Sequence, residues 1–309
     1  MRNIKFKYKL GKGPKHICPK CGRKTFVLYI DTETGQPLSD EVGKCDRADH
    51  CGWHYPPRCY FQDRGLNRRA RPERRQRPRL EPVSRPVSYI DKSKVWQSMG
   101  GDYSNNNLVN HVFGLACKLY GKEEGERRVC DALLALRVGN TEAGDTIFWQ
   151  MDYYDNCRTG KVMRYKPDGH RDHDRFGTWK HKEEGKDFNM EQCLFGLNLV
   201  GFDSRHSTHK PVIIVESEKT ALYGHVFMPE YLWVATGGCG GLSREKCKEL
   251  FGRGKVISLP DLGMTDKWEQ KGKELGIPVS RFLEEKATAE DREKGLDIAD
   301  FIERQIMNS

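Results

Sequence analysis

The chain has 309 residues, of which 37% are hydrophobic and 31% are charged, and this balance predicts two or three domains with a moderate core. No apolar run approaches the roughly 18–20 residues of a membrane span, and the basic N-terminus lacks the apolar segment of a signal peptide, so we expect a cytoplasmic protein without a membrane partner. The net charge of +9 favours a polyanionic partner. In a cytoplasmic chain, 11 cysteines favour metal ligands and buried thiols over disulfides.

Residues 1–60 are rich in Cys, Gly and Pro and show no long helical pattern. Cys18 and Cys21 form a CxxC turn, in which two thiolates can occupy two vertices of a tetrahedron, and Cys45 and Cys51 form the second pair. This spacing predicts a zinc ribbon. Because four thiolates close the coordination shell, we interpret the zinc as structural rather than catalytic.

The segment between the two cysteine pairs predicts two strands, 25–31 and 41–44, joined by a turn. The gap within the second pair is longer than the usual two residues, so a different side chain could supply a ligand, namely His50, His54 or Cys59. Reduced cysteines without metal are the alternative, but a segment this short with few large apolar groups could hardly fold without a metal.

Residues 61–88 are rich in arginine and proline and predict a linker. Like charges repel, prolines disfavour helix and sheet, and almost nothing apolar is available to bury. An extended tether that contacts nucleic-acid phosphates is one interpretation, and a solvated linker is the other. The arginines that we assign to nucleic-acid binding are Arg68, Arg69, Arg71, Arg74 and Arg75.

Residues 89–200 predict a smaller subdomain in which helices are followed by strands. Apolar residues recur at three- and four-residue spacing at first, and from about residue 146 the pattern changes to short alternating strands. Strand periodicity places Arg164 and Lys166 on one face and Lys161 on the other. We interpret these cations as template or nucleotide-phosphate contacts, with a solvated face as the alternative.

Residues 201–309 alternate between strands and helices, which predicts a parallel, Rossmann-like sheet with crossover helices and an α/β fold overall. The apolar run 212–215 is typical of a strand that is buried on both faces, and Glu216 follows at its carboxyl end. A second strand, 255–259, is followed shortly by Asp261. The other predicted elements are strands at 231–235 and 277–282 and helices at 217–227, 243–251, 265–275 and 298–306.

Carboxylates that collect at strand ends repel one another unless a hard cation joins them, and Mg²⁺ held by carboxylates and substrate phosphates is the usual arrangement in nucleotidyl transfer. We therefore predict a catalytic Mg²⁺ or Mn²⁺ site. The candidate ligands are Glu216, Asp261, Asp266, Asp297 and Asp300. Glu218 could bind metal or satisfy a helix N-terminus, and Asp300 could simply face solvent.

Two further segments are open to a functional or a structural interpretation. The glycines after the central strand could let backbone N–H groups approach phosphate, or could form a tight strand-to-helix turn. These are Gly237, Gly238, Gly240 and Gly241. A cluster of metal-ligand types lies in a predicted hairpin turn, and we assign it no metal: His170, Asp172, His173 and Asp174.

Three acidic motifs resemble those of a Toprim domain: IVESEKTA at 214–221, LPD at 259–261 and LDIADFI at 296–302. The order of a zinc ribbon, a helical segment ending in LRVGNT, a basic strand pair and then the acidic strand resembles bacterial-type primases, and also small zinc ribbon–Toprim proteins of mobile elements. The resemblance implies acid/base or metal-assisted chemistry for Glu216 and metal binding for Asp261. It also implies that Asp297 and Asp300 complete the site.

One departure from the family pattern is that Gly263 stands where the second motif, Asp-x-Asp, has its second Asp, and Asp266 is the candidate substitute. We expect a DNA primase-like nucleotidyltransferase that acts on single-stranded DNA with nucleotides as substrates, and a replicative helicase is a candidate partner. The alternatives are a nucleic-acid-binding protein of a mobile element whose site no longer catalyses, and a Toprim nuclease.

Overall fold

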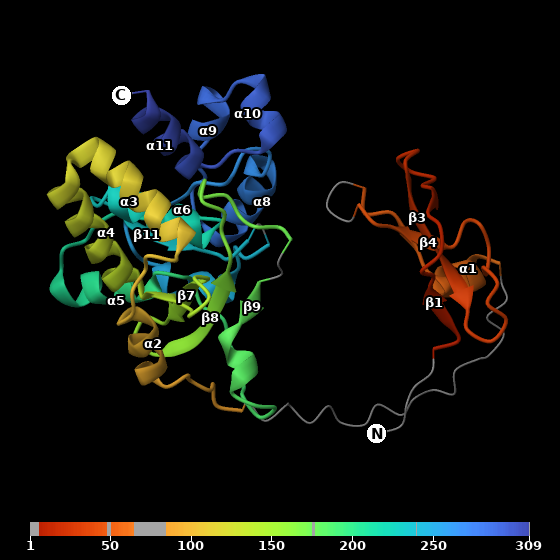
Figure 1. The fold of residues 1–309 in the computed structure, drawn as a ribbon. Helices are drawn as coiled ribbons and strands as arrows, with labels where there is room; N and C mark the ends of the chain where they lie inside the picture. The colour runs from red at the N-terminus through yellow and green to blue at the C-terminus, as the bar shows by residue number, and fades with distance from the viewer. Residues whose placement is uncertain (1–5, 48–50, 65–84, 175–176, 239, 309) are drawn as a thin grey trace. The chain divides into compact units, whose positions relative to one another are not determined.

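The computed structural model describes residues 6–47, 51–64, 85–174, 177–238 and 240–308. The chain divides into two compact units, 1–83 and 84–309, which appear in Figure 1 as the red and the yellow-to-blue parts of the ribbon. Among the described residues, no helix is both long and apolar enough to cross a membrane.

The first unit is a small antiparallel sheet with one short helix. β3 (Lys24–Asp31) pairs with β1 (Tyr8–Leu10), β2 (His16–Ile17) and β4 (Gly43–Cys45), and β4 pairs with β5 (His54–Tyr55). Alternation along β3 buries Phe26 and Leu28 against the cysteine sulfurs, so the core of this unit is small. The two predicted strands are thus present with slightly shifted ends.

Helix α1 (Pro57–Asp63) was not predicted, and its last residues lie in the segment expected to be linker. It starts with a proline in its first turn, where the missing N–H costs nothing. The five linker arginines assigned to nucleic acid, Arg68 to Arg75, lie outside the described residues.

The second unit begins with three helices that lead into an antiparallel sheet. The helices are α2 (Lys92–Met99), α3 (Asn107–Tyr120) and α4 (Lys122–Leu136), as the spacing of apolar residues predicts. The sheet has the order β6-β7-β8-β9. Its strands are β6 (Val138–Asn140), β7 (Thr146–Met151), β8 (Cys157–Met163) and β9 (Thr178–Trp179).

A second sheet follows, in which β10 (Val212–Val215) lies between β11 (Leu232–Ala235) and β12 (Val256–Ser258), with all strands parallel. Helix α6 (Glu218–Phe227) crosses from β10 to β11, and α8 (Thr265–Leu275) and α11 (Ile298–Met307) follow β12. The predicted alternation of strand and helix is therefore confirmed for most elements.

The differences concern short elements. The strand predicted at 277–282 is wrong, because only Val279 forms an isolated bridge with Ser258, and Pro278 has no N–H to extend the ladder. The helix predicted at 243–251 consists of α7 (Arg244–Cys247) and the 3-10 turn η2 (Lys248–Leu250). Elements not predicted are the helices α5 (Leu197–His206), α9 (Phe282–Lys286) and α10 (Ala289–Lys294), the 3-10 turn η1 (Lys180–Glu183), and the short strands β1, β2, β5 and β6.

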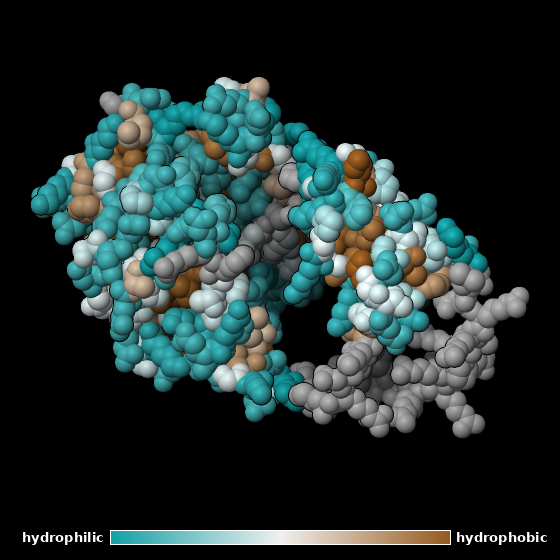
Figure 2. Space-filling view, turned by 45° about the vertical axis from the view of Figure 1, so that its right-hand side comes forward, coloured by the Kyte–Doolittle hydropathy of each residue, from teal (hydrophilic) through white to brown (hydrophobic). Residues whose placement is uncertain are grey.

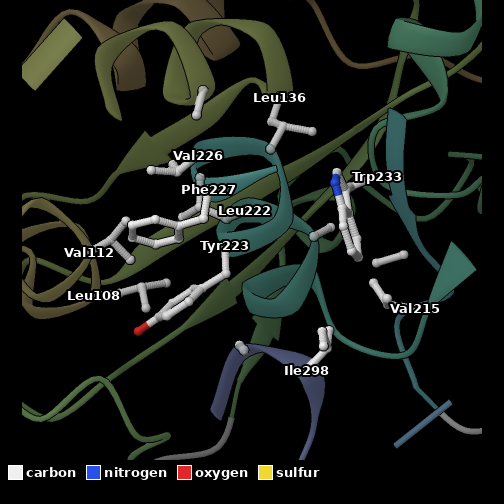
Figure 3. Packing of buried hydrophobic residues seen from close by; sticks show 14 of the residues in the cluster. Leu108, Val112, Leu136, Val215, Leu222, Tyr223, Val226, Phe227, Trp233 and Ile298 are labelled. Atoms are coloured by element: carbon white, nitrogen blue, oxygen red, sulfur yellow. The ribbon is translucent and has the colours of Figure 1, made fainter. Parts of the chain in front are cut away.

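One large hydrophobic cluster joins the helices α3 and α4, the antiparallel sheet and the parallel sheet. Figure 3 shows α6 at its centre, where Leu222, Tyr223, Val226 and Phe227 point toward residues of α3 and α4 on one side. Trp233 of β11 lies on the other side. On the face seen in Figure 2, apolar residues form only small patches, as expected when most of them are used in the core.

The contact between α6 and β11 generates a test of the fold. A Cβ added to Gly224 would clash with the buried Trp233 ring, whereas a Cβ on Gly114, in the exposed part of α3, would meet nothing within 4 Å. We expect Gly224→Ala to lower the free energy of unfolding by roughly 1–3 kcal/mol through overpacking. Gly114→Ala should raise it by roughly 0.5–1 kcal/mol through helix propensity. Chemical denaturation of both variants measures this, and equal effects would contradict the packing.

Candidate functional site

The four predicted cysteine ligands converge in the first unit. The sulfur atoms of Cys18, Cys21, Cys45 and Cys51 all lie within 4.8 Å of one another. The Sγ atoms are 3.7 Å apart in Cys18 and Cys51, and 4.0 Å apart in Cys21 and Cys45. A tetrahedral zinc ion with four Zn–S bonds needs edges of about 3.8 Å, so this donor set fits a structural zinc ion.

Two glycine turns present these thiols. Gly22 and Gly52 each follow a cysteine of the cluster with positive φ (66° and 60°), a conformation that favours glycine. The N–H groups of Cys51 and Gly52 both donate to the carbonyl oxygen of Arg47, which ties Cys51 to the segment that follows Cys45. A backbone N–H group, that of Arg23, lowers the pKa of the Cys21 thiol to about 6, which favours the thiolate that a metal requires.

The alternative ligands do not join this cluster where the structure describes them. The Nε2 atom of His54 forms a 2.9 Å hydrogen bond with the hydroxyl of Tyr29, and Cys59 lies in α1. His50 lies outside the described residues.

In the second unit, the carboxylates meet because β10 and β12 are adjacent and parallel. Glu216 follows β10, and Asp261 follows β12, so both stand at the same edge of the sheet. The N–H of Leu262 donates to the carbonyl of Leu296, which places the start of α11 beside the Asp261 turn. Asp297 and Asp300 then form a reciprocal capping box at the N-terminus of α11.

These elements border a cleft of about 660 Å³. Its acidic wall includes Glu216, Glu218, Asp261 and Asp300. Glu216 and Glu218 are only 6% and 2% exposed, and the Oε1 atom of each has no hydrogen-bond partner. Buried carboxylate oxygens without a partner are costly, and carboxylate oxygens are the ligands that Mg²⁺ prefers, so this wall fits a hard divalent cation.

The pKa values of these carboxyl groups are raised, which means that their surroundings disfavour the ionised form. Burial raises the pKa of Glu216 to about 7. Burial, followed by the nearby Asp297 and Glu216 carboxylates, raises the pKa of Asp261 to about 9. Burial and Asp297 also raise the pKa of Asp300. At neutral pH Asp261 therefore favours the protonated form and Glu216 is near its midpoint, so a cation bound by these groups would release protons.

Basic side chains form the other part of the cleft. They come from β8 and from the hairpin that follows it, and are Lys161, Lys166, His170, Arg171 and His173. Lys161 Nζ lies 2.8 Å from Glu218 Oε2 and donates to the Gly237 carbonyl at 3.3 Å. Glu218 therefore has a specific ion-pair partner in addition to its place in the first turn of α6.

The prediction for the basic strand is confirmed for Lys161 and Arg164, which lie on opposite faces, and is wrong for Lys166, which lines the cleft with Lys161 instead of sharing the face of Arg164. Alternation runs through Lys161, Met163 and Tyr165, which all line the cleft, whereas Arg164 points away and pairs with Asp145. Lys166 reaches the cleft because the chain turns there, where its N–H donates to the carbonyl of His170. The hairpin expected around residues 170–174 is present, but its contribution to the cleft could not be inferred from the sequence.

The remaining predicted residues take different places. Gly237 and Gly238 line the cleft with positive φ. Asp266 does not: its side chain is 91% exposed, with Arg281 as an ion-pair partner at 3.9 Å. Asp266 is therefore separated from the other acidic candidates. Lys219, which the sequence did not single out, lines the cleft beside Asp300.

The zinc centre generates a prediction about domain independence. Removal of metal by a chelator should unfold residues 1–60 and leave the melting of the second unit unchanged, because zinc binding provides most of the folding free energy of such a small unit. Cys51→Ser should lower the bound zinc from one equivalent to near zero. Cys59→Ser, which removes a thiol outside the cluster, should retain it. Elemental analysis and hydrogen exchange measure both effects, and loss of the second unit's structure on chelation would contradict the division.

The raised pKa of Asp261 generates a prediction about stability. The folded state holds a proton on Asp261 up to a pH of about 9, while the unfolded state releases it near its ordinary value of 3.8, so stability is lost as pH rises through this window. At pH 8, Asp261→Asn should be more stable than the wild type by on the order of 1 kcal/mol, or roughly 2–4 °C in Tm. The gain should shrink toward pH 5.

Thermal melts at several pH values, with and without Mg²⁺, measure this effect. Mg²⁺ should stabilise the wild type and have little effect on Asp261→Asn. Asp266→Asn is the matched control, because its exposed carboxylate should change neither the pH profile nor the response to Mg²⁺. A variant at position 261 that is less stable than the wild type at pH 8 would show that the carboxylate is not under repulsion.

Comparisons with solved structures find bacterial and phage primases. The RNA polymerase domain of Mycobacterium tuberculosis primase DnaG has 13% identity and a TM-score of 0.34, with 72% of this chain and 66% of that chain covered. The primase fragment of the bacteriophage T7 primase-helicase protein has 13% identity and a TM-score of 0.36, covering 86% and 88%. The zinc-binding and RNA polymerase domains of Aquifex aeolicus primase have 12% identity and a TM-score of 0.37, covering 98% and 80%. Scores this low do not by themselves establish a shared fold.

Comparisons of the sequence are more direct. No curated protein matches the chain. Residues 5–66 match a family described as a putative zinc beta-ribbon finger, in agreement with the cysteine cluster. Residues 106–262, half of the chain, match a domain of unknown function, DUF6371, and this segment includes the basic strand, Glu216 and Asp261. The protein therefore belongs to the DUF6371 family and carries a zinc-ribbon finger before that domain.

Proposed function

We propose that the protein is a DNA primase-like nucleotidyltransferase that makes a short primer on single-stranded DNA by divalent-metal-dependent phosphoryl transfer. The observation that carries the proposal is the cleft, in which buried carboxylates at two parallel strand ends face the cations Lys161, Lys166 and Arg171. The acidic motifs that resemble a Toprim domain supply these carboxylates. A site with one acidic and one basic wall suits a substrate that brings phosphates together with a metal ion.

The acidic wall would hold Mg²⁺ or Mn²⁺ through Glu216, Asp261 and Asp300, and the ion would neutralise charge on the phosphoryl group. Glu216 has a further role available to it. The resemblance to a Toprim domain implies acid/base chemistry for Glu216 as the alternative to metal binding: a buried carboxylate that does not hold the ion would accept a proton from the attacking hydroxyl.

The basic wall would bind and orient the nucleotide phosphates. Lys166 and Arg171 line the cleft on the hairpin after β8, and Gly237 and Gly238 expose backbone to the same cleft with no Cβ. The basic side chains of this wall would also contact phosphates of the template strand. Arg164, which pairs with Asp145 away from the cleft, has no place in this proposal.

Template binding would extend beyond the cleft to the zinc ribbon and the arginine-rich segment. Both are strongly basic, and phosphate contacts by such segments supply affinity without sequence preference. Single-stranded DNA and nucleotides are the proposed ligands, and a replicative helicase is the candidate protein partner.

One observation favours a second candidate function, a nucleic-acid-binding protein whose site no longer catalyses. Gly263 replaces the second acidic residue of the family pattern, and Asp266 points to solvent and cannot replace it. The acidic wall thus has one carboxylate fewer than the pattern that it resembles.

Primer synthesis from labelled nucleotides on single-stranded DNA, with Mg²⁺ or Mn²⁺, tests the two functions. We expect product with the wild type and a loss of at least about 100-fold with Glu216→Gln, which keeps the shape of the side chain and removes its charge. Asp266→Asn should retain full activity, because its carboxylate lies outside the cleft. No product from the wild type, together with intact binding of single-stranded DNA, would instead support the binding function.

A further inference from the structure

A second pocket lies between the end of helix α4 and helix α5, and we call it the α4–α5 pocket. Its volume is about 390 Å³, which is within the range of small-molecule sites, and none of its described lining residues lines the cleft. The two helices are tied together here, because Asn198 Nδ2 of α5 donates to the carbonyl of Ala135 in α4 at 3.0 Å. The pocket is therefore part of the folded second unit and is separate from the proposed catalytic site.

Three buried polar atoms on residues of this pocket find no hydrogen-bond partner in the part of the chain that the structure describes. They are Asn198 Oδ1, Asp155 Oδ1 and Arg137 Nε. Asn198 is only 6% exposed. Asp155 Oδ1 lies 3.6 Å from Arg137 Nη2, which is too long for a hydrogen bond, while Lys92 pairs with the other oxygen of this carboxylate. Because unpaired polar groups are costly in a protein interior, two acceptors and one donor at one pocket indicate a ligand with the complementary groups.

Arg137 is held in an unusual conformation at the pocket. It ends helix α4 with a φ of 55°, at a position where helices favour glycine and where residues with a Cβ are strained. Its guanidinium group lies over the Trp96 ring, 4.7 Å from the ring centre, and donates to the carbonyl of Leu134. These contacts fix the guanidinium plane. Backbone strain that the surrounding structure maintains is typical of binding sites.

Two large apolar side chains that line the pocket are exposed to solvent. Leu134 of α4 is 55% exposed and Phe202 of α5 is 57% exposed. The Phe202 ring stacks on the ring of His206 with centroids 3.9 Å apart, which restricts its orientation. Exposed apolar side chains beside polar atoms without partners suit a flat ring, because such a ring has apolar faces and forms hydrogen bonds at its edge.

We propose that the α4–α5 pocket binds a guanine nucleotide outside the cleft. One edge of guanine carries two donor groups, N1 and N2, for the oxygens of Asp155 and Asn198, and its O6 atom would accept from Arg137 Nε. Adenine, cytosine and uracil each offer a single donor group, so none of them satisfies both oxygens. Arg205 lines the pocket and uses one N–H to donate to the Tyr153 carbonyl at 3.2 Å, which leaves other N–H groups for a phosphate. This inference does not depend on the proposed function.

Isothermal titration calorimetry of the full-length, zinc-loaded protein with guanosine monophosphate (GMP), without added Mg²⁺, tests the inference. We expect one GMP per chain. Its affinity should be at least tenfold higher than that of inosine monophosphate, which lacks the N2 amino group, and than that of adenosine monophosphate (AMP). The variant Lys166→Ala/Arg171→Ala, which removes basic side chains from the cleft, should bind GMP as the wild type does.

A change in base preference separates recognition of the base from a structural role. Asp155→Asn keeps the shape of the side chain and suits the φ of 66° at this position, but its amide can donate where the carboxylate accepts. It should bind GMP at least tenfold more weakly and prefer xanthosine monophosphate, which has a carbonyl in place of the N2 amino group. Asp131→Asn is the matched control, because this pocket carboxylate is 61% exposed and pairs with Arg127, and it should keep the wild-type preference. Thermal melts confirm that each variant is folded.

An oligothymidylate that contains one guanine identifies the source of the base. Competition with GMP would assign the pocket to a guanine within a single strand, and the absence of competition would assign it to a free nucleotide. Several outcomes would overturn the inference: no GMP binding by the folded wild type, equal affinity for GMP and AMP, loss of binding in Lys166→Ala/Arg171→Ala, or an unchanged base preference in Asp155→Asn.

Discussion

The second unit brings several buried carboxyl groups together, and the repulsion among them is the main constraint on its structure. Parallel pairing of β10 with β12 brings Glu216 and Asp261 to one edge, and the hydrogen bond between Leu262 and Leu296 adds the acidic end of α11. Burial destabilises each negative charge there, as the raised pKa values of Glu216 and Asp261 show. Such an arrangement is costly to stability and is typical of sites whose charge is offset by a ligand.

Much of the surrounding structure serves to hold this edge in place. Helix α6 starts at the site and packs along its length against α3, α4 and β11, with Gly224 allowing the close approach of Trp233 (Figure 3). The antiparallel sheet contributes to the same core through Phe148 and Met163, and the latter strand, β8, also carries Lys161 to the cleft. Core packing and the position of the basic wall are therefore parts of one arrangement.

The stability of the zinc ribbon is limited by the small size of its core. Its core consists of little more than the cysteine sulfurs, Phe26 and Leu28, which cannot bury enough apolar surface to fold alone. Metal coordination takes the place of a larger core, with Cys45 at the end of β4 and Cys21 and Cys51 each followed by a glycine of positive φ. In our proposal the two units use cations for different reasons: zinc allows the ribbon to fold, and a divalent ion in the cleft would offset the charge of the buried carboxylates.

The sequence by itself determined the features that depend on local pattern. The CxxC spacing, the apolar run before Glu216 and the alternation of strands and helices each follow from residues close together in the chain, and they predicted the ribbon, the parallel sheet and the meeting of Glu216 with Asp261. Only the tertiary structure decided which cations face the carboxylates. Periodicity within β8 separates Lys161 from Arg164 but cannot say which of the two faces meets the carboxylates, and the approach of Lys166 and Lys219 to the cleft depends on the hairpin after β8 and on the packing of α6.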